Sequence, residues 1–212
     1  MSRVRYRVSI SLDGYVCGLK QSKQHPQGEG GMKLHEWVFP TRAFRQLLKL
    51  GAGGEEGVSS DVVQRAVEGV GATIMGRNMF GGQPGPWKAD DPWNGWWGDE
   101  PPFHHPVFVL THHARPPLAL QGTTFTFVTD GLDRALALAR LAAAGKDIVL
   151  GGGAHVARAA LHAGIIDDIM LHQVPILLGA GERLFDGVRD LRGLALREVL
   201  PAPGVTHLRF AR

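Results

Sequence analysis

Cysteine is almost absent from the sequence, which contains Cys17 alone. A single cysteine excludes an intramolecular disulfide framework and is typical of a protein kept in a reducing compartment. The sequence also lacks an apolar run of the roughly 18 residues that a membrane-spanning helix requires, and its beginning lacks the apolar segment of a signal peptide. We therefore expect a cytoplasmic protein without a membrane partner.

Clusters of one charge are absent as well. Lys and Arg number 23 and Asp and Glu number 20, which gives a formal net charge of +3, and the basic residues are scattered along the chain. Because no basic helix is interleaved with aromatic residues, nucleic acid is not an expected partner. The scattered charge predicts a solvated surface with a mild preference for small anionic ligands.

Signatures of metal and hydrolytic sites are missing. The pairs His104–His105 and His112–His113 place neighbouring side chains on opposite sides of an extended chain. Neither a zinc-protease motif nor paired cysteines accompany them, so we expect no bound metal. The sequence also lacks the Gly-x-Ser-x-Gly segment of one large class of hydrolases.

Alternating strand and helix patterns predict the fold class. With 212 residues, 44% of them hydrophobic, the chain is expected to form one domain over residues 1–212. The expected strands cover 3–11, 72–75, 106–110, 124–128, 147–150 and 167–174, with a closing hairpin of 195–200 and 205–210. The expected helices cover 35–38, 41–50, 131–144, 154–163 and a segment up to Val70 that Ser59, Ser60 or Asp61 caps. This order predicts an α/β protein with a mostly parallel sheet and an antiparallel C-terminal edge.

One segment organises these predictions: the apolar run Asp147–Leu150 leads through three consecutive glycines into a helix. Backbone N–H groups at such a helix start point outward, and a phosphate can approach them where no Cβ atom intervenes. We expect a nucleotide pyrophosphate to bind along Gly151, Gly152, Gly153, Ala154, His155 and Val156. The spacing fits neither the dinucleotide fingerprint nor the phosphate loop of NTPases, and a tight turn without a ligand is the alternative.

Two other expected strands end in residues suited to the same ligand. These residues are Gly76, Arg77, Asn78 and Met79 after one strand, and Leu110, Thr111 and His112 at the end of the other. Ligands of open α/β sheets bind at the carboxyl ends of the strands, so these segments should converge on one site. Arg77 would supply positive charge, and the N–H groups after it would add helix-start dipoles. The alternatives are that Arg77 is an ordinary surface arginine and that His112 lies at a solvated strand end.

These motifs resemble those of the dihydrofolate reductase superfamily, and more closely the branch that contains the reductase domain of bacterial riboflavin biosynthesis. The matching segments are Ser11-Leu12-Asp13-Gly14, Met75-Gly76-Arg77, Gly151-Gly152-Gly153, 161–168 and 174–179. The resemblance covers nearly the whole chain. It implies a three-layer dihydrofolate reductase-like fold, NADPH as the cofactor and a homodimer. In that picture Thr111, His112 and Arg115 lie near the 2′-phosphate of NADPH.

Catalytic and substrate residues are less defined by pattern. Asp13, which follows the first strand, is the candidate for positioning or proton delivery, with a turn-forming aspartate as the alternative. Trp37, Phe80 and Trp87 are candidates for stacking on a planar substrate. Their alternative is a small loop core or a dimer contact. That alternative is the role we expect for Trp93, Trp96 and Trp97, which lie in a long ordered loop over 81–105.

Three functions remain open. The first is an NADPH-dependent reductase of a small, heterocyclic substrate. The second is the riboflavin-pathway enzyme itself, 5-amino-6-(5-phosphoribosylamino)uracil reductase. Gly151 counts against it, because the resemblance implies a substrate-contacting glutamate at that position. The third is a non-catalytic protein that binds NADP through the same glycines.

Overall fold

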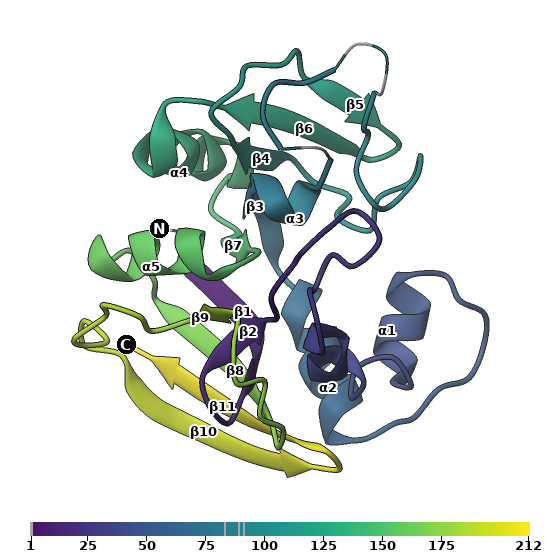
Figure 1. The fold of residues 1–212 in the computed structure, drawn as a ribbon, viewed down its shortest axis with the longest axis vertical. Helices are drawn as coiled ribbons and strands as arrows, with labels where there is room; N and C mark the ends of the chain where they lie inside the picture. Colours follow the sequence, from purple (N-terminus) through teal and green to yellow (C-terminus); the bar gives the residue numbers. More distant parts are fainter. Residues whose placement is uncertain (1, 83, 89, 91) are drawn as a thin grey trace. The chain divides into compact units, whose positions relative to one another are not determined.

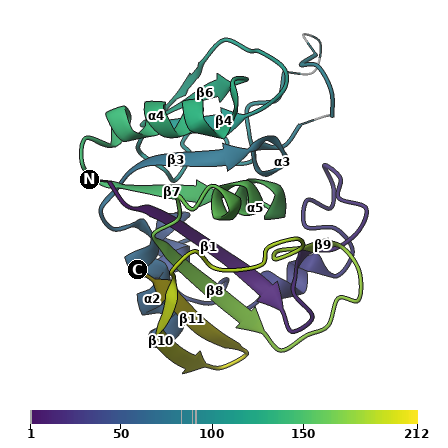
Figure 2. The ribbon, with the colours of Figure 1, turned by 90° about the vertical axis from the view of Figure 1, so that its left-hand side faces the viewer.

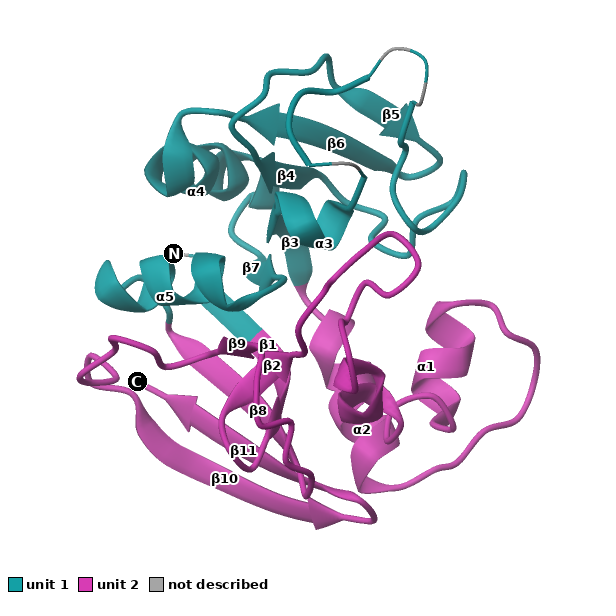
Figure 3. Cartoon of the chain, in the orientation of Figure 1, with its two compact units in different colours: residues 1–6, 70–166 teal, residues 7–69, 167–212 magenta. Residues whose placement is uncertain are grey.

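The computed structural model describes residues 2–82, 84–88, 90 and 92–212. The chain divides into two compact units, drawn in different colours in Figure 3. Unit 1 contains Met1–Tyr6 and Val70–Ile166, and unit 2 contains Arg7–Gly69 and Asp167–Arg212. Strand β1 (Val4–Ser11) begins in unit 1 and ends in unit 2. The expectation of one domain over residues 1–212 remains a prediction.

Unit 1 contains a mostly parallel sheet. Its strands are β1, β7 (Asp147–Gly151), β3 (Val70–Gly76), β4 (Val107–Leu110), β6 (Thr123–Val128) and β5 (Leu118–Leu120), in that order. Neighbouring strands are parallel except β5, which runs antiparallel to β6. Ile74, Val107 and Ile148 are fully buried, as expected for strands covered on both faces.

Three helices belong to unit 1, and Figure 1 shows their places in the chain. They are α3 (Arg77–Phe80), α4 (Gly131–Ala143) and α5 (Ala154–His162). Helix α4 packs against β3 and β4, and α5 contacts β3. Both helices bury alanines, among them Ala139 and Ala157, whose small side chains allow close approach to the neighbouring elements.

The strands of unit 2 are joined by antiparallel pairs at the C-terminal end of the chain. Strand β11 (Val205–Ala211) pairs antiparallel with both β10 (Ala195–Ala202) and β8 (Asp168–Val174). A second small sheet joins β2 (Tyr15–Cys17) to β9 (Glu182–Arg183). The helical elements are the 3-10 helix η1 (Gly31–His35), α1 (Arg42–Leu47) and α2 (Val58–Val67). Across the described ranges, no helix combines the length and apolarity needed to cross a membrane.

The expected α/β class, parallel strands and C-terminal hairpin are confirmed, and the differences have local causes. Residues 36–40 form a turn, so the expected helix over 35–38 is wrong. Helix α2 starts after Gly57, whose φ of 107° only glycine adopts readily, so Ser59 and Ser60 lie inside the helix and do not cap it. Strands β2, β5 and β9 escaped prediction because two or three residues carry no readable period.

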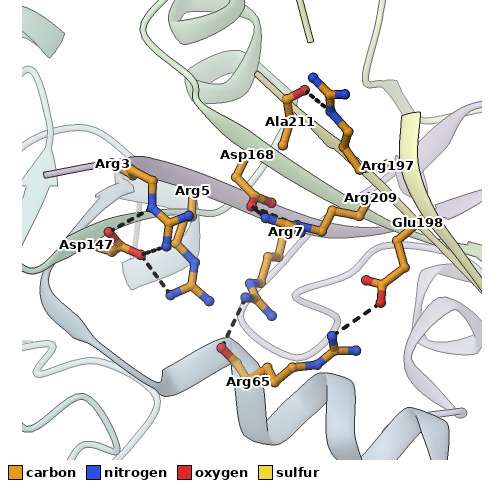
Figure 4. Close-up of polar contacts among 10 residues, drawn as sticks. All are labelled: Arg3, Arg5, Arg7, Arg65, Asp147, Asp168, Arg197, Glu198, Arg209 and Ala211. Carbon is orange, nitrogen blue, oxygen red and sulfur yellow. Dashed lines mark hydrogen bonds and ion pairs between the residues drawn. The ribbon is translucent and has the colours of Figure 1, made fainter. Parts of the chain in front are cut away.

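Charged residues along β1 are paired within each unit (Figure 4). In unit 1, Arg3 and Arg5 both reach the carboxylate of Asp147, at 2.9 and 3.4 Å. In unit 2, Arg7 donates to the backbone carbonyl oxygen of Arg65 at 3.2 Å. These arginines therefore tie strands and helices together, in keeping with the dispersed charge of the sequence.

Candidate functional site

Two loops of unit 1 lie side by side at the carboxyl ends of parallel strands. The register places Met75 of β3 opposite Gly151 of β7, and Figure 2 shows both strands pointing toward α3 and α5. A Cβ atom on Gly76 would come within 3.0 Å of the Val156 side chain. A Cβ atom on Gly152 would lie 3.1 Å from the Cβ atom of Met79. The structure therefore brings the glycine loop and the Gly76–Met79 turn together.

The glycine loop leaves its helix start uncapped. Gly152 has a φ of +101°, a conformation that disfavours every residue with a side chain. Its carbonyl oxygen is turned toward the interior, where it accepts a hydrogen bond of 3.3 Å from the Tyr6 hydroxyl. Gly153 is exposed and is the N-cap of α5, and within the described part of the chain this helix start has no side-chain cap hydrogen bond. Its uncapped N–H groups fit a phosphate group. The missing Cβ atoms of Gly76 and Gly152 leave room for the side chains of Val156 and Met79, so these glycines serve the packing of the two loops.

Arg77 packs over an indole at the edge of this turn. Its guanidinium carbon lies 3.1 Å from the centre of the Trp87 ring, and its Nε donates to the Gly81 carbonyl oxygen at 3.1 Å. The guanidinium carbon of Arg115 lies 4.9 Å from the same ring centre. Burial, reinforced by the like charge of Arg115, lowers the pKa of Arg77 to about 10. The guanidinium stays charged near neutral pH, and two cations share one aromatic ring.

The tryptophan-rich loop supports α3 from its carboxyl end. The indole N–H of Trp93 donates to the Phe80 carbonyl oxygen at 2.8 Å, and that of Trp96 donates to the Met79 carbonyl oxygen at 2.9 Å. Carbonyl groups at a helix end have no partner inside the helix, so the loop satisfies them and fixes the turn. Trp93 and Trp97 pack on the core, which confirms the packing role expected for them.

Phe80 does not fit the substrate-stacking role expected for it. Its ring is fully buried and packs edge-on against Phe125 and Phe127. Trp87 is enclosed by the same cluster and by Arg77, and its N–H donates to the His113 carbonyl oxygen at 2.8 Å. Phe80 is part of the apolar core beneath the turn, and the partly buried Trp87 packs against that core through Phe80 and Phe127.

The end of β4 contributes a third segment of unit 1. Leu110 is half-buried and Thr111 buried, while His112 is exposed. The Thr111 N–H donates to the Val128 carbonyl oxygen at 3.0 Å, so its backbone continues the sheet, and its hydroxyl accepts from the His113 N–H at 3.2 Å. The His113 carbonyl oxygen also accepts a hydrogen bond from the Trp87 indole, so this segment is connected to the ring over which Arg77 packs.

Asp13 belongs to unit 2 and forms the centre of a turn network. It accepts from the Ser11 hydroxyl at 2.6 Å and from the backbone N–H groups of Leu178 and Gly179 at 3.1 and 2.7 Å. The Ser11 bond, followed by those backbone bonds, lowers the pKa of Asp13 to about 2. A carboxyl group this acidic holds no proton near neutral pH. The geometry favours the positioning role over proton delivery.

A cavity of about 550 Å³ lies in unit 2 and includes the third stacking candidate, Trp37. Its walls come from η1 and the turn after it, the start of α2, the end of β8 and the hairpin of β10 and β11. Glu36 and Ser59 are among its lining residues. Trp37, one of the residues expected to contact substrate, thus lines a cavity.

Two buried histidines beside this cavity escaped sequence analysis. His172 of β8 and His207 of β11 are register partners, and their Nδ1 atoms are 2.9 Å apart. The Nε2 atom of His207 lies 3.2 Å from the Ser59 hydroxyl. Burial lowers the pKa of His207 to about 4 and that of His172 well below its ordinary value. The sequence does contain one signal of this pair, because each histidine is a polar residue at an inward-facing position of a largely apolar strand. Within the described residues, no group of three or more potential metal ligands occurs.

Comparisons with known proteins agree on the architecture. A family model described as the RibD C-terminal domain matches residues 2–207. A putative riboflavin biosynthesis protein from Shewanella sp. PV-4 is 20% identical with a TM-score of 0.55, over 100% of this chain and 99% of that one. RibD from Acinetobacter baumannii is 16% identical with a TM-score of 0.56, over 100% of this chain and 58% of that one. No curated protein matches the chain.

A dihydrofolate reductase from Enterococcus faecalis, solved with NADP(H) and RAB-propyl, is 11% identical with a TM-score of 0.51, over 99% of this chain and 96% of that one. At these identities the solved structures show the fold, which is dihydrofolate reductase-like as the resemblance implied. The family model adds the class of enzyme, because it extends over nearly the whole chain. The protein belongs to the RibD C-terminal domain family and is a reductase of dihydrofolate reductase-like fold.

Proposed function

We propose that this reductase uses NADPH and binds the cofactor's pyrophosphate at the glycine loop of unit 1. The observation that carries the proposal is the uncapped start of α5, preceded by Gly152 at a φ of +101°. The N–H groups of Ala154, His155 and Val156 would bind phosphate oxygens. Gly76 lets the adjacent turn pack closely against Val156. Bound NADPH supplies the hydride of the reduction.

Arg77 and Arg115 are the proposed partners of the 2′-phosphate. Their guanidinium groups both lie close to the Trp87 ring, so a dianionic phosphate beside that ring would be attracted to both. Thr111 and His112 would complete this subsite, since His113 joins their segment to the Trp87 indole. The arrangement favours NADPH over NADH.

The proposed substrate is a small heterocycle. A relative from Thermotoga maritima carries the name diaminohydroxyphosphoribosylaminopyrimidine deaminase/5-amino-6-(5-phosphoribosylamino)uracil reductase; it is 11% identical, and this chain covers 56% of it. The same uracil reductase activity is the second candidate, favoured by the family. Gly151 weighs against it, because a glycine cannot supply a substrate-binding carboxylate there. Membership of a reductase family weighs against a protein that binds NADP without turnover.

Titration with NADPH tests the cofactor proposal. Energy transfer from tryptophan to the nicotinamide should appear on binding, and NADH should bind at least about tenfold more weakly, a difference of about 1.4 kcal/mol. A panel of pyrimidines and pterins, followed by NADPH absorbance, then identifies the substrate. Equal affinity for NADPH, NADH and adenosine would contradict the assignment of phosphate contacts to this loop.

Assembly and location complete the proposal. By the family resemblance we propose a homodimer, which light scattering after gel filtration would measure, and a cytoplasmic location. Cys17 is buried, and burial, together with the charge of Glu182, raises the pKa of its thiol to about 11. Such a thiol stays protonated and unreactive, in keeping with a structural cysteine of a reducing compartment.

A further inference from the structure

The cavity of unit 2 has the size and walls of a small-molecule site. Its volume of about 550 Å³ falls inside the range of about 300–1,000 Å³ typical of ligand pockets. Trp37, Val174 and Ile176 give it apolar walls. Its remaining apolar lining is rich in proline, namely Pro40, Pro175, Pro201 and Pro203. Proline fixes the backbone, so much of this wall is already in one conformation before a ligand binds.

Trp37 is held as an aromatic platform. Its indole N–H donates to the Ser9 hydroxyl at 3.0 Å. Its ring centre lies 4.6 Å from that of His172 and 4.9 Å from that of His207. The histidines fix the ring from the protein interior while Trp37 also lines the cavity. A flat ligand can stack on a ring that is already oriented, with little loss of side-chain freedom.

Ser59 provides a polar anchor on the same wall. Its hydroxyl lies 3.2 Å from Nε2 of His207, whose Nδ1 meets Nδ1 of His172. A hydrogen bond between two Nδ1 atoms requires one of them to donate and the other to accept. The tautomer of His172 therefore determines the tautomer of His207. When His207 donates to Ser59, the hydroxyl proton is free for the cavity; when His207 accepts, a hydroxyl lone pair is free. Either way Ser59 retains hydrogen-bonding capacity for a ligand.

The charge of the lining selects against anions. The ionisable lining residues are Lys33, Glu36, Glu55 and Glu56. Glu56 forms an ion pair with Arg42, which leaves the carboxylates of Glu36 and Glu55 against the one ammonium group of Lys33. A phosphate monoester entering this cavity would meet net like charge, whereas an amino-substituted heterocycle would find acceptors for its N–H groups.

We propose that this cavity is the substrate site, and that it takes a planar nitrogen heterocycle without a phosphate group, stacked on Trp37 and hydrogen-bonded by Ser59. The inference rests on the proposed reductase function and narrows its substrate class. It also separates this chain from the phosphoribosyl substrate named in the Thermotoga maritima relative. The specificity is set by the carboxylates at the cavity, and Glu36 and Glu55 are the residues to change.

The test is isothermal titration with matched pairs: cytidine, uridine and 6-hydroxymethylpterin, each against its phosphate monoester. At least one unphosphorylated member should bind about tenfold more tightly than its monoester. Trp37→Ala should remove that binding, while Trp37→Phe, which keeps a flat ring, should retain most of it. Ser59→Ala should weaken it about fivefold. No binding by any unphosphorylated member, or binding unchanged in Trp37→Ala, would overturn the proposal.

Charge is tested with a double variant and a matched control. The double variant with Glu36→Gln and Glu55→Gln should reduce the difference in affinity between each unphosphorylated compound and its monoester. Glu29→Gln removes a carboxylate that pairs with Lys20 outside the cavity lining, and it should leave this difference in affinity unchanged. Equal effects of the two changes would contradict the specificity role. NADPH titrations of the same variants report on the glycine loop separately, so a failure of the cofactor proposal is distinguishable from a failure of this one.

Discussion

The glycine loop of unit 1 and the cavity of unit 2 present ligand-binding groups of different origin. The loop offers backbone N–H groups at the start of α5, where Gly153 adds no side-chain cap. The cavity offers side chains, with Trp37 as its aromatic wall and Ser59 as its polar anchor. One site is made by leaving side chains out, and the other by assembling them.

This difference determines how each site can be broken. The loop tolerates little added volume, because a Cβ atom at Gly151 would come within 2.8 Å of the Met79 sulfur. The cavity tolerates loss of its walls poorly, because Trp37 is fixed by Ser9 and by two buried imidazoles. Added atoms should therefore damage the loop, and removed atoms should damage the cavity.

The largest effect is expected from adding a carboxylate to the loop. Gly153 has a φ of −73° and a ψ of −179°, an extended conformation open to any residue, and aspartate is a favoured N-cap. In Gly153→Asp the new carboxylate should bond the first-turn N–H groups and repel the pyrophosphate. NADPH affinity should fall about 100-fold or more, roughly 2.7 kcal/mol, as measured by fluorescence titration. The melting temperature should be unchanged or higher.

Gly153→Asn is the matched control for this change. Asparagine caps the same N–H groups without a charge, so its loss of affinity measures occlusion alone. Gly152→Asp is less informative, because its φ of +101° adds backbone strain to any effect on the ligand. Full NADPH affinity in Gly153→Asp would rule out the α5 start as the phosphate site.

Sequence reasoning located the loop because its signal is local. Three glycines between an apolar run and a helix are visible in one window, and the register of β3 and β7 places Gly76 beside them. The cavity draws on segments from 33–41 to 201–204, so no single window contains it. The burial of Phe80 was not foreseen, because its ring packs on Phe125 and Phe127 of β6, which are far from it in the sequence. The His172–His207 pair depended on a strand register that no local pattern specifies.

An intermediate effect should come from the charged edge of the loop. Arg77→Ala removes one of the two guanidinium groups at Trp87 and should weaken NADPH about 10–100-fold, the range for a lost hydrogen bond to a charged group. NADH should lose less, because it has no 2′-phosphate. Arg140→Ala, on the surface helix α4, is the control. An equal loss for nicotinamide riboside, which carries no phosphate, would show that Arg77 supports the fold of the turn and does not contact the anion.

An effect on stability alone, with no expected change in NADPH affinity, should appear in the pH dependence of unit 2's polar interior. Burial, with a further contribution from Arg65, lowers the pKa of His207 to about 4, whereas the unfolded chain restores a value near 6.5. Between these values the unfolded state binds a proton that the folded state excludes, so stability is lost as pH falls below about 6.5. At pH 5 this residue should lower the free energy of unfolding by about 2 kcal/mol relative to pH 7.5. In His207→Gln, the free energies of unfolding measured in urea at pH 5 and pH 7.5 should differ by correspondingly less. This holds even if the variant is less stable at both pH values. His162→Gln, exposed on α5, should keep the wild-type difference. If His207→Gln kept the wild-type difference as well, folding would not lower the pKa of His207, and its pairing with His172 would not exclude a proton at pH 5.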